Sequence, residues 1–329
     1  MTDGVVDLER LSDLQTPWCL RVAVTLRVAE HIAEGASSIE ELAATTQCDR
    51  EALHSVLTYL ASRGVFEEPN PGRFELNEAA HKLLEPGMRL GLDLDGIGGR
   101  MSFAWGTLPS YVKTGMPAYH EFFGRPFWED LDANPVVAAS FDALMGPAGH
   151  GLPDPAVLLN DDWAEIQSVV DVGGGTGTLL AEILRARPTM RGTLVDLPRT
   201  VGRSADVFDA AGVADRVTAL GQSFFEPLPA GADLYLLMKV LNDWPDQQAQ
   251  EILRRCAEAA RPSHGRVVIC GGVSPEGAPR SLVIEMLLVG GRSRGLPEFR
   301  ALAASAGLEV TASGRLRGGK FAVECRSIS

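Results

Sequence analysis

The sequence lacks the features that would place it in a membrane, outside the cell or around a metal ion. No apolar run reaches the roughly 18 residues of a membrane-spanning helix. No positively charged, apolar signal segment opens the chain, and the five cysteines are scattered without a CxxC pair. This pattern is typical of reduced thiols in a cytoplasmic protein, so we expect neither a disulfide nor a metal site.

Positive charge is also scarce. The net charge is −13 over 329 residues, while the shares of apolar (45%) and charged (22%) residues are ordinary for a globular protein. Such an acidic chain is unsuited to binding nucleic acid or an anionic membrane surface. The length corresponds to about two domains, and the two parts of the chain differ in pattern.

Residues 1–100 read as a helical domain. The segment 16–35 is apolar on nearly every face, which a solvent-exposed helix would not tolerate. It could be an ordinary core helix, but the pattern favours a helix shared across a homodimer.

A winged-helix pattern follows in the same domain. Ser38 and Glu41 have the spacing of a capping box, a turn at 47–49 leads to a second helix, and 65–77 has the Pro/Gly turn of a hairpin. Such a module can bind DNA, but the first 100 residues carry 9 basic against 17 acidic side chains. We therefore interpret it as a dimerisation domain.

The remainder, 101–329, is predicted to be a Rossmann-like catalytic domain. From residue 161, short apolar strands alternate with helical stretches, which indicates a parallel, doubly wound α/β sheet. The expected strands span 168–172, 192–197, 216–220, 232–238, 265–270, 308–313 and 320–325.

The segment 101–160 is helical and rich in aromatic residues and methionine. Side chains of this kind are most often core, but here they lie between the dimerisation domain and the sheet, which favours a substrate cleft. The residues expected to form its wall are Met101, Phe103, Trp105, Phe141 and Met145.

The strongest signal in the chain is VVDVGGGTGTLLAEILRARP, in which an apolar strand leads through a glycine turn into a helix. Glycines let the backbone bend tightly and approach a ligand. The next strand ends in Asp196, nineteen residues after Gly177, where a carboxylate can bind two ribose hydroxyls. Asp171 precedes the loop, and Thr178 stands where NAD-binding loops have a third glycine. The pattern favours S-adenosylmethionine, which carries an ammonium and a sulfonium, over NAD or a loop without ligand.

Further motifs carry a resemblance to a known family. They are DVGGGTG, TLVDLPRTV, DRVTALGQSFFEPLPAGADLYLL, VLNDWPD with ILRRCAEAARP, and LLVGGRSRGLPEFRALAASAGL. On these motifs, residues 14–326 resemble the homodimeric class I O-methyltransferases of plant and actinomycete secondary metabolism, including naphthoate and aromatic polyketide O-methyltransferases. The resemblance implies S-adenosylmethionine as cofactor, S-adenosylhomocysteine as its product, and a small aromatic substrate. The cofactor-binding residues that it implies are Asp171, Gly173, Gly175, Asp196, Leu197, Ser223 and Phe224, with Trp244 near the adenine.

The chain departs from this family at the base. Where those enzymes have a histidine that takes the substrate's proton, this sequence has Asn242, whose amide cannot hold a proton at neutral pH. Gly271 and Ser293 stand where the family has the acids that orient the histidine. Because the cofactor motifs are kept while three catalytic positions change, we interpret the change as functional.

Two readings of the chemistry stay open, beside a third in which the chain is a pseudoenzyme that only binds cofactor or a partner. The first is methyl transfer to an aromatic natural-product intermediate by proximity alone, with Asn242 hydrogen-bonded to the substrate. The second is an enzyme of this fold repurposed for cyclisation (cyclopropane-forming or pericyclic), hydroxylation or decarboxylation without ordinary methyl transfer. Other candidates for substrate contact are Lys239 and Glu285, and His120 is a less favoured replacement base.

Overall fold

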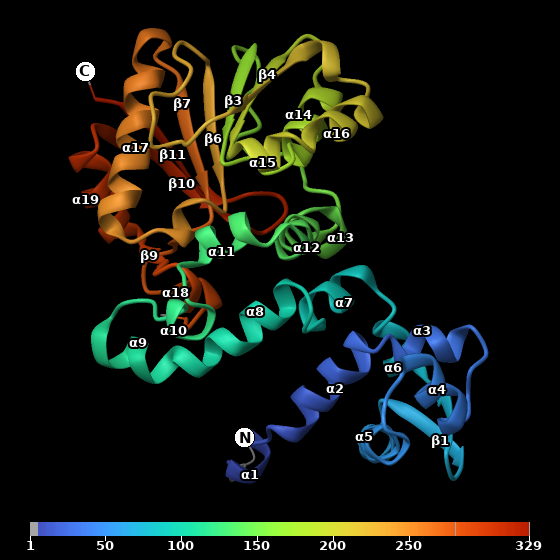
Figure 1. Ribbon diagram of the computed structural model, residues 1–329. Coiled ribbons are helices and arrows are strands. Elements are labelled where there is room, and N and C mark those ends of the chain that lie inside the picture. The colour runs from blue at the N-terminus through green and yellow to red at the C-terminus, as the bar shows by residue number, and fades with distance from the viewer. Residues whose placement is uncertain (1–5, 280, 329) are drawn as a thin grey trace, which may run out of the picture. The chain divides into compact units, whose positions relative to one another are not determined.

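The computed structural model describes residues 6–279 and 281–328 (Figure 1). The chain divides into two compact units. The first comprises the described residues up to Ser102 together with Val136–Leu144, and the second comprises Phe103–Pro135 together with the described residues from Met145 onward. Within the described part of the chain, no helix is long and apolar enough to cross a membrane.

The first unit is a small helical domain with a two-stranded hairpin. Its elements are α1 (Leu8–Leu11), α2 (Gln15–Thr25), α3 (Val28–Ala33), α4 (Ile39–Thr46), α5 (Arg50–Ser62), β1 (Phe66–Asn70), β2 (Arg73–Leu76), α6 (Glu78–Lys82) and α7 (Pro86–Leu92), followed by most of α8 (Ile97–Ala104) and of α12 (Pro135–Met145).

The predicted winged-helix pattern is confirmed. The Ser38 hydroxyl accepts from the backbone N–H of Glu41, and the Glu41 carboxylate accepts from the backbone N–H of Ser38, which is the expected capping box. Gln47 ends α4 in the left-handed conformation, and the antiparallel pair β1–β2 follows α5. Leu42, Leu57 and other apolar side chains form a separate hydrophobic core in this unit.

The expectation of one continuous helix over 16–35 is wrong. Arg27 adopts a left-handed backbone conformation (φ 55°) between α2 and α3, so the helix is broken there. Apolar side chains near the beginning of the unit face solvent: Leu8 is 74% exposed, and Leu11 and Leu14 are each 73% exposed. An exposed apolar surface of this kind is typical of a protein–protein contact.

The second unit contains the large sheet and the helices around it. Its strands are β3 (Ser168–Val172), β4 (Arg191–Asp196), β5 (Val217–Gly221), β6 (Leu234–Met238), β7 (Arg266–Cys270), β8 (Val273–Ser274), β9 (Arg294–Gly295), β10 (Leu308–Arg315) and β11 (Phe321–Ser327). Its helices are η1 (Trp105–Thr107), α9 (Leu108–Thr114), α10 (His120–Phe123), α11 (Phe127–Ala133), α13 (Pro147–His150), α14 (Thr178–Ala186), α15 (Pro198–Val201), α16 (Ser204–Ala211), η2 (Ala214–Arg216), η3 (Leu241–Asp243), α17 (Asp246–Ala260), η4 (Arg261–Ser263), α18 (Ile284–Leu288) and α19 (Leu296–Ser305).

The sheet has the strand order β10-β11-β7-β6-β3-β4-β5. Each of the seven expected strands is found, within two residues at either end. The five strands from β3 to β7 are parallel, but β11 pairs antiparallel with both β7 and β10, so the sheet is mixed rather than wholly parallel.

Side chains alternate between two cores on the faces of this sheet. Along β6, Tyr235 and Leu237 join the core that includes α17 and α19, whereas Leu234 and Leu236 join the core that includes α14 and α16. Figure 1 shows α17 and α14 on opposite sides of the sheet. Strands buried on both faces explain why the sequence reads as short, continuous apolar runs.

The order of the strands also fixes where a ligand can bind. β3 connects to β4 on one side, while its other neighbour, β6, leads on to β7 in the opposite direction. At such a reversal the loops after the two central strands diverge and leave a crevice at their carboxyl ends. The loops concerned are the glycine turn after β3 and the segment 239–245 after β6.

Candidate active site

The turn after β3 requires glycine because neighbouring atoms leave no room for side chains. Gly173, Gly175 and Gly177 have φ values of +69°, +62° and +83°. A Cβ on Gly173 would lie 2.7 Å from a methyl of Val240, and one on Gly174 would lie 2.4 Å from an oxygen of Asp171. By contrast, a Cβ on Gly175 would meet no atom within 4 Å, so the open side of the turn is at Gly175.

Asp171 is a buried carboxylate in β3, directly before this turn. It is fully buried, and neither of its oxygens has a hydrogen-bond partner among the described residues. Burial, together with the nearby charge of Asp196, raises the pKa of Asp171 to about 7. An ionised carboxylate held in this way needs a positively charged donor, which makes the turn suited to a cationic ligand.

Asp196 ends β4 and faces the same turn. Its carboxylate accepts from the backbone N–H of Gly175 at 2.8 Å and from that of Leu197 at 2.7 Å. Burial raises the pKa of Asp196, while these hydrogen bonds oppose the rise. The two aspartates therefore lie on either side of the glycine turn, as the motif spacing predicted.

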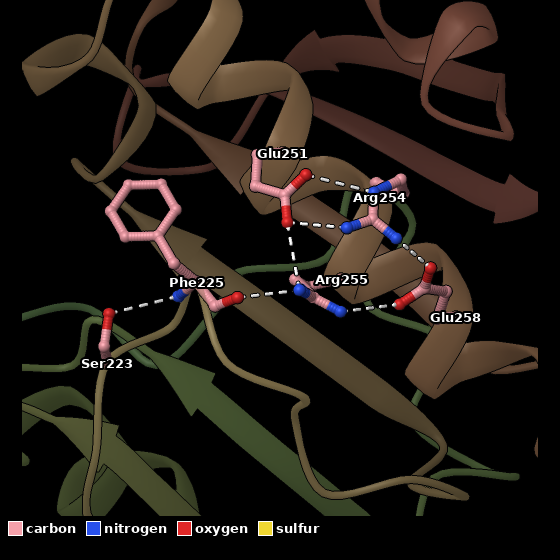
Figure 2. Close-up of polar contacts among 6 residues, drawn as sticks. All are labelled: Ser223, Phe225, Glu251, Arg254, Arg255 and Glu258. Carbon is pink, nitrogen blue, oxygen red and sulfur yellow. Dashed lines mark hydrogen bonds and ion pairs between the residues drawn. The ribbon is translucent and has the colours of Figure 1, made fainter.

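The segment after β5 is held in place from α17. Ser223 Oγ accepts from the backbone N–H of Phe225 at 3.3 Å, and the Phe225 carbonyl accepts from Arg255 Nε at 2.8 Å. Figure 2 shows that Arg255 also pairs with Glu251 and Glu258 on its own helix. These contacts fix the backbone on both sides of Phe224.

Aromatic rings gather beside the glycine turn. The Phe224 ring lies 3.4 Å from where a Cβ on Gly173 would be. Trp244 packs edge-to-face against Phe224 and Phe225 and stacks on Trp128 at 6.3 Å between ring centroids. The structure thus brings together Gly173, Phe224 and Trp244, which were expected to bind the cofactor. Their flat, apolar surface is suited to a purine ring.

The segment after β6 is a short turn fastened by Arg294. This arginine is 1% exposed and donates to the carbonyls of Leu241 (3.0 Å) and Trp244 (2.7 Å), at the two ends of the turn. It also pairs with Asp246 at 2.8 Å. The sequence analysis did not identify Arg294, because a single arginine in a loop gives no periodic or motif signal.

Within this turn, Asn242 and Asp243 form a hydrogen-bonded pair. Asn242 Nδ2 donates to Asp243 Oδ1 at 2.7 Å, which leaves Asn242 Oδ1 as an acceptor. That oxygen is buried and has no partner among the described residues. Asn242 therefore offers this buried oxygen as an acceptor to whatever binds beside it.

Gly271 and Ser293, the two positions expected to lack orienting acids, differ in where they lie relative to Asn242. Gly271 lies beside the turn, since a Cβ there would be 3.5 Å from Asn242 Oδ1. Ser293 is exposed. Gly291 instead packs against the turn, since a Cβ on Gly291 would lie 2.1 Å from the Asn242 carbonyl oxygen. Neither side of Asn242 thus carries an acid at these positions.

Charged groups surround Asp243. Burial and the charge of Glu285 raise the pKa of Asp243 to about 8, while Lys239 opposes the rise. Lys239 has a left-handed backbone (φ 56°), and burial followed by the charge of Lys320 lowers its pKa. Burial and the two lysines likewise lower the pKa of His150, a residue that the sequence analysis left without a role.

The expected substrate wall is divided between the two units. Met101 and Phe141 belong to the first unit, and Phe103, Trp105 and Met145 belong to the second. In the second unit, η1, which begins at Trp105, packs against α18, and α18 packs against η3. Trp105, Glu285 and Asn242 therefore lie on three successive elements in contact.

The remaining candidates receive less support from the structure. His120 is exposed at the beginning of α10, while the adjacent Tyr119 is buried and donates to Asp130 at 2.7 Å. Among the described residues, no cluster of three or more His, Cys, Asp or Glu side chains could hold a metal ion.

Comparison with known proteins agrees with this geometry. Residues 105–309 match the profile of an O-methyltransferase domain, and residues 9–86 match that of an O-methyltransferase dimerisation domain.

Two curated relatives align over 94% of the chain. One is a 2,7-dihydroxy-5-methyl-1-naphthoate 7-O-methyltransferase from Streptomyces carzinostaticus, 39% identical and covered over 94% of its length. The other is the aclacinomycin 10-hydroxylase RdmB from Streptomyces purpurascens, 40% identical and covered over 86% of its length. A similar solved structure is the O-methyltransferase NcsB1 of neocarzinostatin biosynthesis in complex with S-adenosylmethionine and 2-hydroxy-5-methyl naphthoic acid. It has a TM-score of 0.90 and 38% identity, with 99% of this chain and 100% of that chain covered.

The buried Asp171 predicts an unusual dependence of stability on pH. Its pKa rises from 3.8 to about 7 on folding, so the folded state holds this proton more tightly, and stability falls as the pH rises from about 4 to about 7. Asp171→Asn removes that loss. We expect the variant to gain up to about 4 kcal/mol relative to the wild type between pH 5 and pH 8. Urea unfolding of the ligand-free protein measures this, with Asp209→Asn on the exposed face of α16 as the control. The same pH dependence in both variants would contradict the assignment.

Proposed function

The chain belongs to the O-methyltransferase family and is an S-adenosylmethionine-dependent enzyme of aromatic natural-product biosynthesis; on that premise we propose that it methylates a hydroxyl of an aromatic acceptor without a histidine base. The observation that carries the proposal is the turn after β6. It lies beside the glycine turn, with Val240 against Gly173, yet it presents Asn242 where the resemblance implies a histidine.

The residues around the glycine turn fit the cofactor. S-adenosylmethionine supplies an electrophilic methyl group on a positively charged sulfur. We assign Asp171 to its ammonium group, because the buried carboxylate has no partner of its own. Asp196 would hold the ribose hydroxyls. We assign Leu197, the next residue, to the same part of the cofactor site. Gly173 and Gly175 have no side chains and so give the ligand access. Phe224 and Trp244 supply the flat surface for the adenine, and Ser223 positions Phe224.

The acceptor that the site supports best is a flat hydroxy acid. The naphthoate named for the 7-O-methyltransferase relative and the naphthoic acid bound to NcsB1 are both flat hydroxy acids. We assign Phe103, Trp105 and Met145 of the second unit to the apolar wall. Lys239, with Lys320 close enough to lower its pKa, is suited to the acceptor's carboxylate, and Glu285 on α18 lies near the same charges.

Positioning would supply most of the rate. An acceptor oxygen held in line with the methyl carbon already gains several kcal/mol over the reaction in solution. Asn242 Oδ1 contributes by accepting a hydrogen bond from the acceptor hydroxyl, since that oxygen is buried and otherwise unpaired. An amide in this place orients the hydroxyl but takes no proton from it.

A second candidate function is hydroxylation. It is favoured by the 40% identity to aclacinomycin 10-hydroxylase RdmB over 94% of this chain. In that case the bound cofactor would act by its charge and keep its methyl group. No observation favours cyclisation or decarboxylation over these two.

We also infer that the protein is a homodimer. The match of residues 9–86 to a dimerisation domain supports this, as do the exposed leucines of the first unit, Leu8, Leu11 and Leu14.

The cofactor assignment predicts which substitutions abolish binding. Gly175→Arg should remove measurable binding of S-adenosylmethionine and S-adenosylhomocysteine, because the arginine would fill the open side of the turn. Asp196→Ala should weaken binding by about 10- to 100-fold through loss of charge-assisted hydrogen bonds. Titration calorimetry measures both. Gly212→Arg is the matched control, since Gly212 has a similar φ (+67°) and equal space but lies at the end of α16. No heat with either ligand in the wild type would overturn the assignment.

Methyl-labelled cofactor tests the reaction itself. With 2,7-dihydroxy-5-methyl-1-naphthoic acid as the probe acceptor, whose 7-hydroxyl is the one that the naphthoate relative methylates, we expect the label in an O-methyl product. Asn242→Ala should lower kcat/KM by only about 2- to 10-fold, because it removes one hydrogen bond of roughly 0.5–1.5 kcal/mol. A hydroxylated product with the cofactor unchanged would instead support the second candidate.

The dimer is tested by mass in solution. Light scattering of the wild type at micromolar concentration should give twice the 35.2 kDa chain mass. Leu11→Glu with Leu14→Glu should shift the mass to that of a monomer, since charges would have to be buried in the contact. Ile328→Glu, another exposed apolar position at 45%, should leave the dimer intact. A monomeric wild type would refute the inference.

A further inference from the structure

The proposed methyl transfer leaves one proton without a destination. An acceptor hydroxyl bound to Asn242 Oδ1 must lose its proton as the oxygen attacks, and neither Asn242 nor Gly271 can take it. Next to Asn242 in the same turn lies a carboxylate, Asp243. It had no role in the sequence analysis beyond being part of a motif.

The geometry places this carboxylate within reach of the acceptor. Asn242 donates to Asp243 Oδ1 at 2.7 Å through one atom of its amide and offers the other atom, Oδ1, to a ligand. A hydroxyl bound to that oxygen would share the Asn242 amide with Asp243, and its proton could pass to the carboxylate directly or through one bridging water. The Asp243 backbone N–H donates to the Val240 carbonyl at 3.1 Å, and Val240 packs against Gly173 of the cofactor turn.

The turn also holds the carboxylate in a fixed position. Arg294 donates to the carbonyls of Leu241 and Trp244 on either side of the pair, so the backbone of Asp243 cannot shift without breaking buried hydrogen bonds. A Cβ on Gly291 would lie 2.9 Å from the Asp243 Cα, which shows how closely the next loop packs on it.

We propose that Asp243 is the proton acceptor of this enzyme, oriented by Asn242 and poised between the carboxylate of Glu285 and the ammonium of Lys239. In the step, the acceptor oxygen forms a bond to the methyl carbon and its proton passes to the Asp243 carboxylate. The bond between carbon and sulfur breaks, and its electron pair stays on sulfur to give S-adenosylhomocysteine. This inference rests on the proposed methyl transfer.

The charged groups around Asp243 match this role. Burial and Glu285 raise its pKa to about 8, and Lys239 limits the rise. A carboxylate with its ordinary pKa near 4 would hold a phenolic proton poorly, whereas one near 8 is well matched to a phenol. Other ionisable groups nearby are Arg294, Lys320 and His150. Arg294 is bonded to the carbonyls of the turn, Lys320 acts on Lys239, and the pKa of His150 is itself lowered by the two lysines.

The other candidate bases fit less well. His120 is exposed on α10. Burial and Lys320 lower the pKa of Lys239, but among the described residues no hydrogen bond joins its ammonium group to the Asn242–Asp243 pair. Glu285 interacts with Asp243 but is not hydrogen-bonded to the amide that would bind the acceptor, as far as the described contacts show.

The test is single-turnover methyl transfer from labelled S-adenosylmethionine to 2,7-dihydroxy-5-methyl-1-naphthoic acid between pH 6 and pH 9.5. For the wild type we expect the rate to rise with pH through about 8 and then level, because only the ionised carboxylate accepts a proton. Asp243→Asn should be at least about 100-fold slower and lose this limb. With a nitro-substituted analogue whose hydroxyl is already ionised, Asp243→Asn should be less than about tenfold slower than the wild type, because no proton has to be removed.

Two further variants separate a proton acceptor from a structural residue. Glu285→Gln removes a charge that raises the Asp243 pKa, so the limb should move to lower pH. Lys239→Met removes a charge that lowers it, so the limb should move to higher pH. Retention of rate and limb in Asp243→Asn would overturn the proposal while leaving methyl transfer intact.

One measurement does not depend on turnover. Infrared difference spectra of the protein with S-adenosylhomocysteine should show a protonated carboxyl that titrates near pH 8 in the wild type and is missing from Asp243→Asn. If Asp243 is ionised throughout this range, the proposal fails. If the wild type labels no acceptor but the band titrates as expected, the fault lies with the proposed function. Calorimetry with S-adenosylhomocysteine and light scattering confirm that each variant is folded.

Discussion

The buried guanidinium of Arg294 fixes the segment on which the proposed chemistry depends. It is almost fully excluded from solvent, and it donates to carbonyls at both ends of the Leu241–Trp244 turn while Asp246 balances its charge. A buried charge of this kind is tolerated only when its donors are satisfied, so turn and guanidinium stabilise each other. Because the bonds go to backbone atoms, they hold the turn whatever side chains it carries.

Opposite this turn, the glycine loop is built around negative charge. The Asp171 carboxylate has no hydrogen-bond partner among the described residues, and the Asp196 carboxylate accepts from backbone N–H groups of Gly175 and Leu197. Both carboxylates lie against a loop whose open face is at Gly175. The ligand-free site is thus electrostatically unfavourable, and a cation that enters it relieves the repulsion. This favours a cofactor with an ammonium and a sulfonium over a pyrophosphate.

Sequence reasoning reached the fold and the cofactor loop because both have regular patterns. Strands buried on both faces read as apolar runs, and the spacing from the glycine turn to Asp196 follows from the length of one strand–helix–strand unit. The break at Arg27 was missed because an apolar pattern continues across it. Arg294, Asp243 and His150 were missed because their environment depends on chain segments far apart in sequence. The pKa of Asp243 comes from burial, Glu285 and Lys239, and a sequence gives no distances between such groups.

The corner at Gly271 and Gly272 restricts which residues the loop beside Asn242 can carry. Both glycines have left-handed φ values, +97° and +76°, and a Cβ on Gly272 would lie 2.7 Å from the Asn242 nitrogen. A side chain at 271 would strain the backbone, and one at 272 would collide with the Asn242 backbone. New polar groups beside Asn242 can therefore come only from other loops, because this corner admits no side chain without moving the backbone.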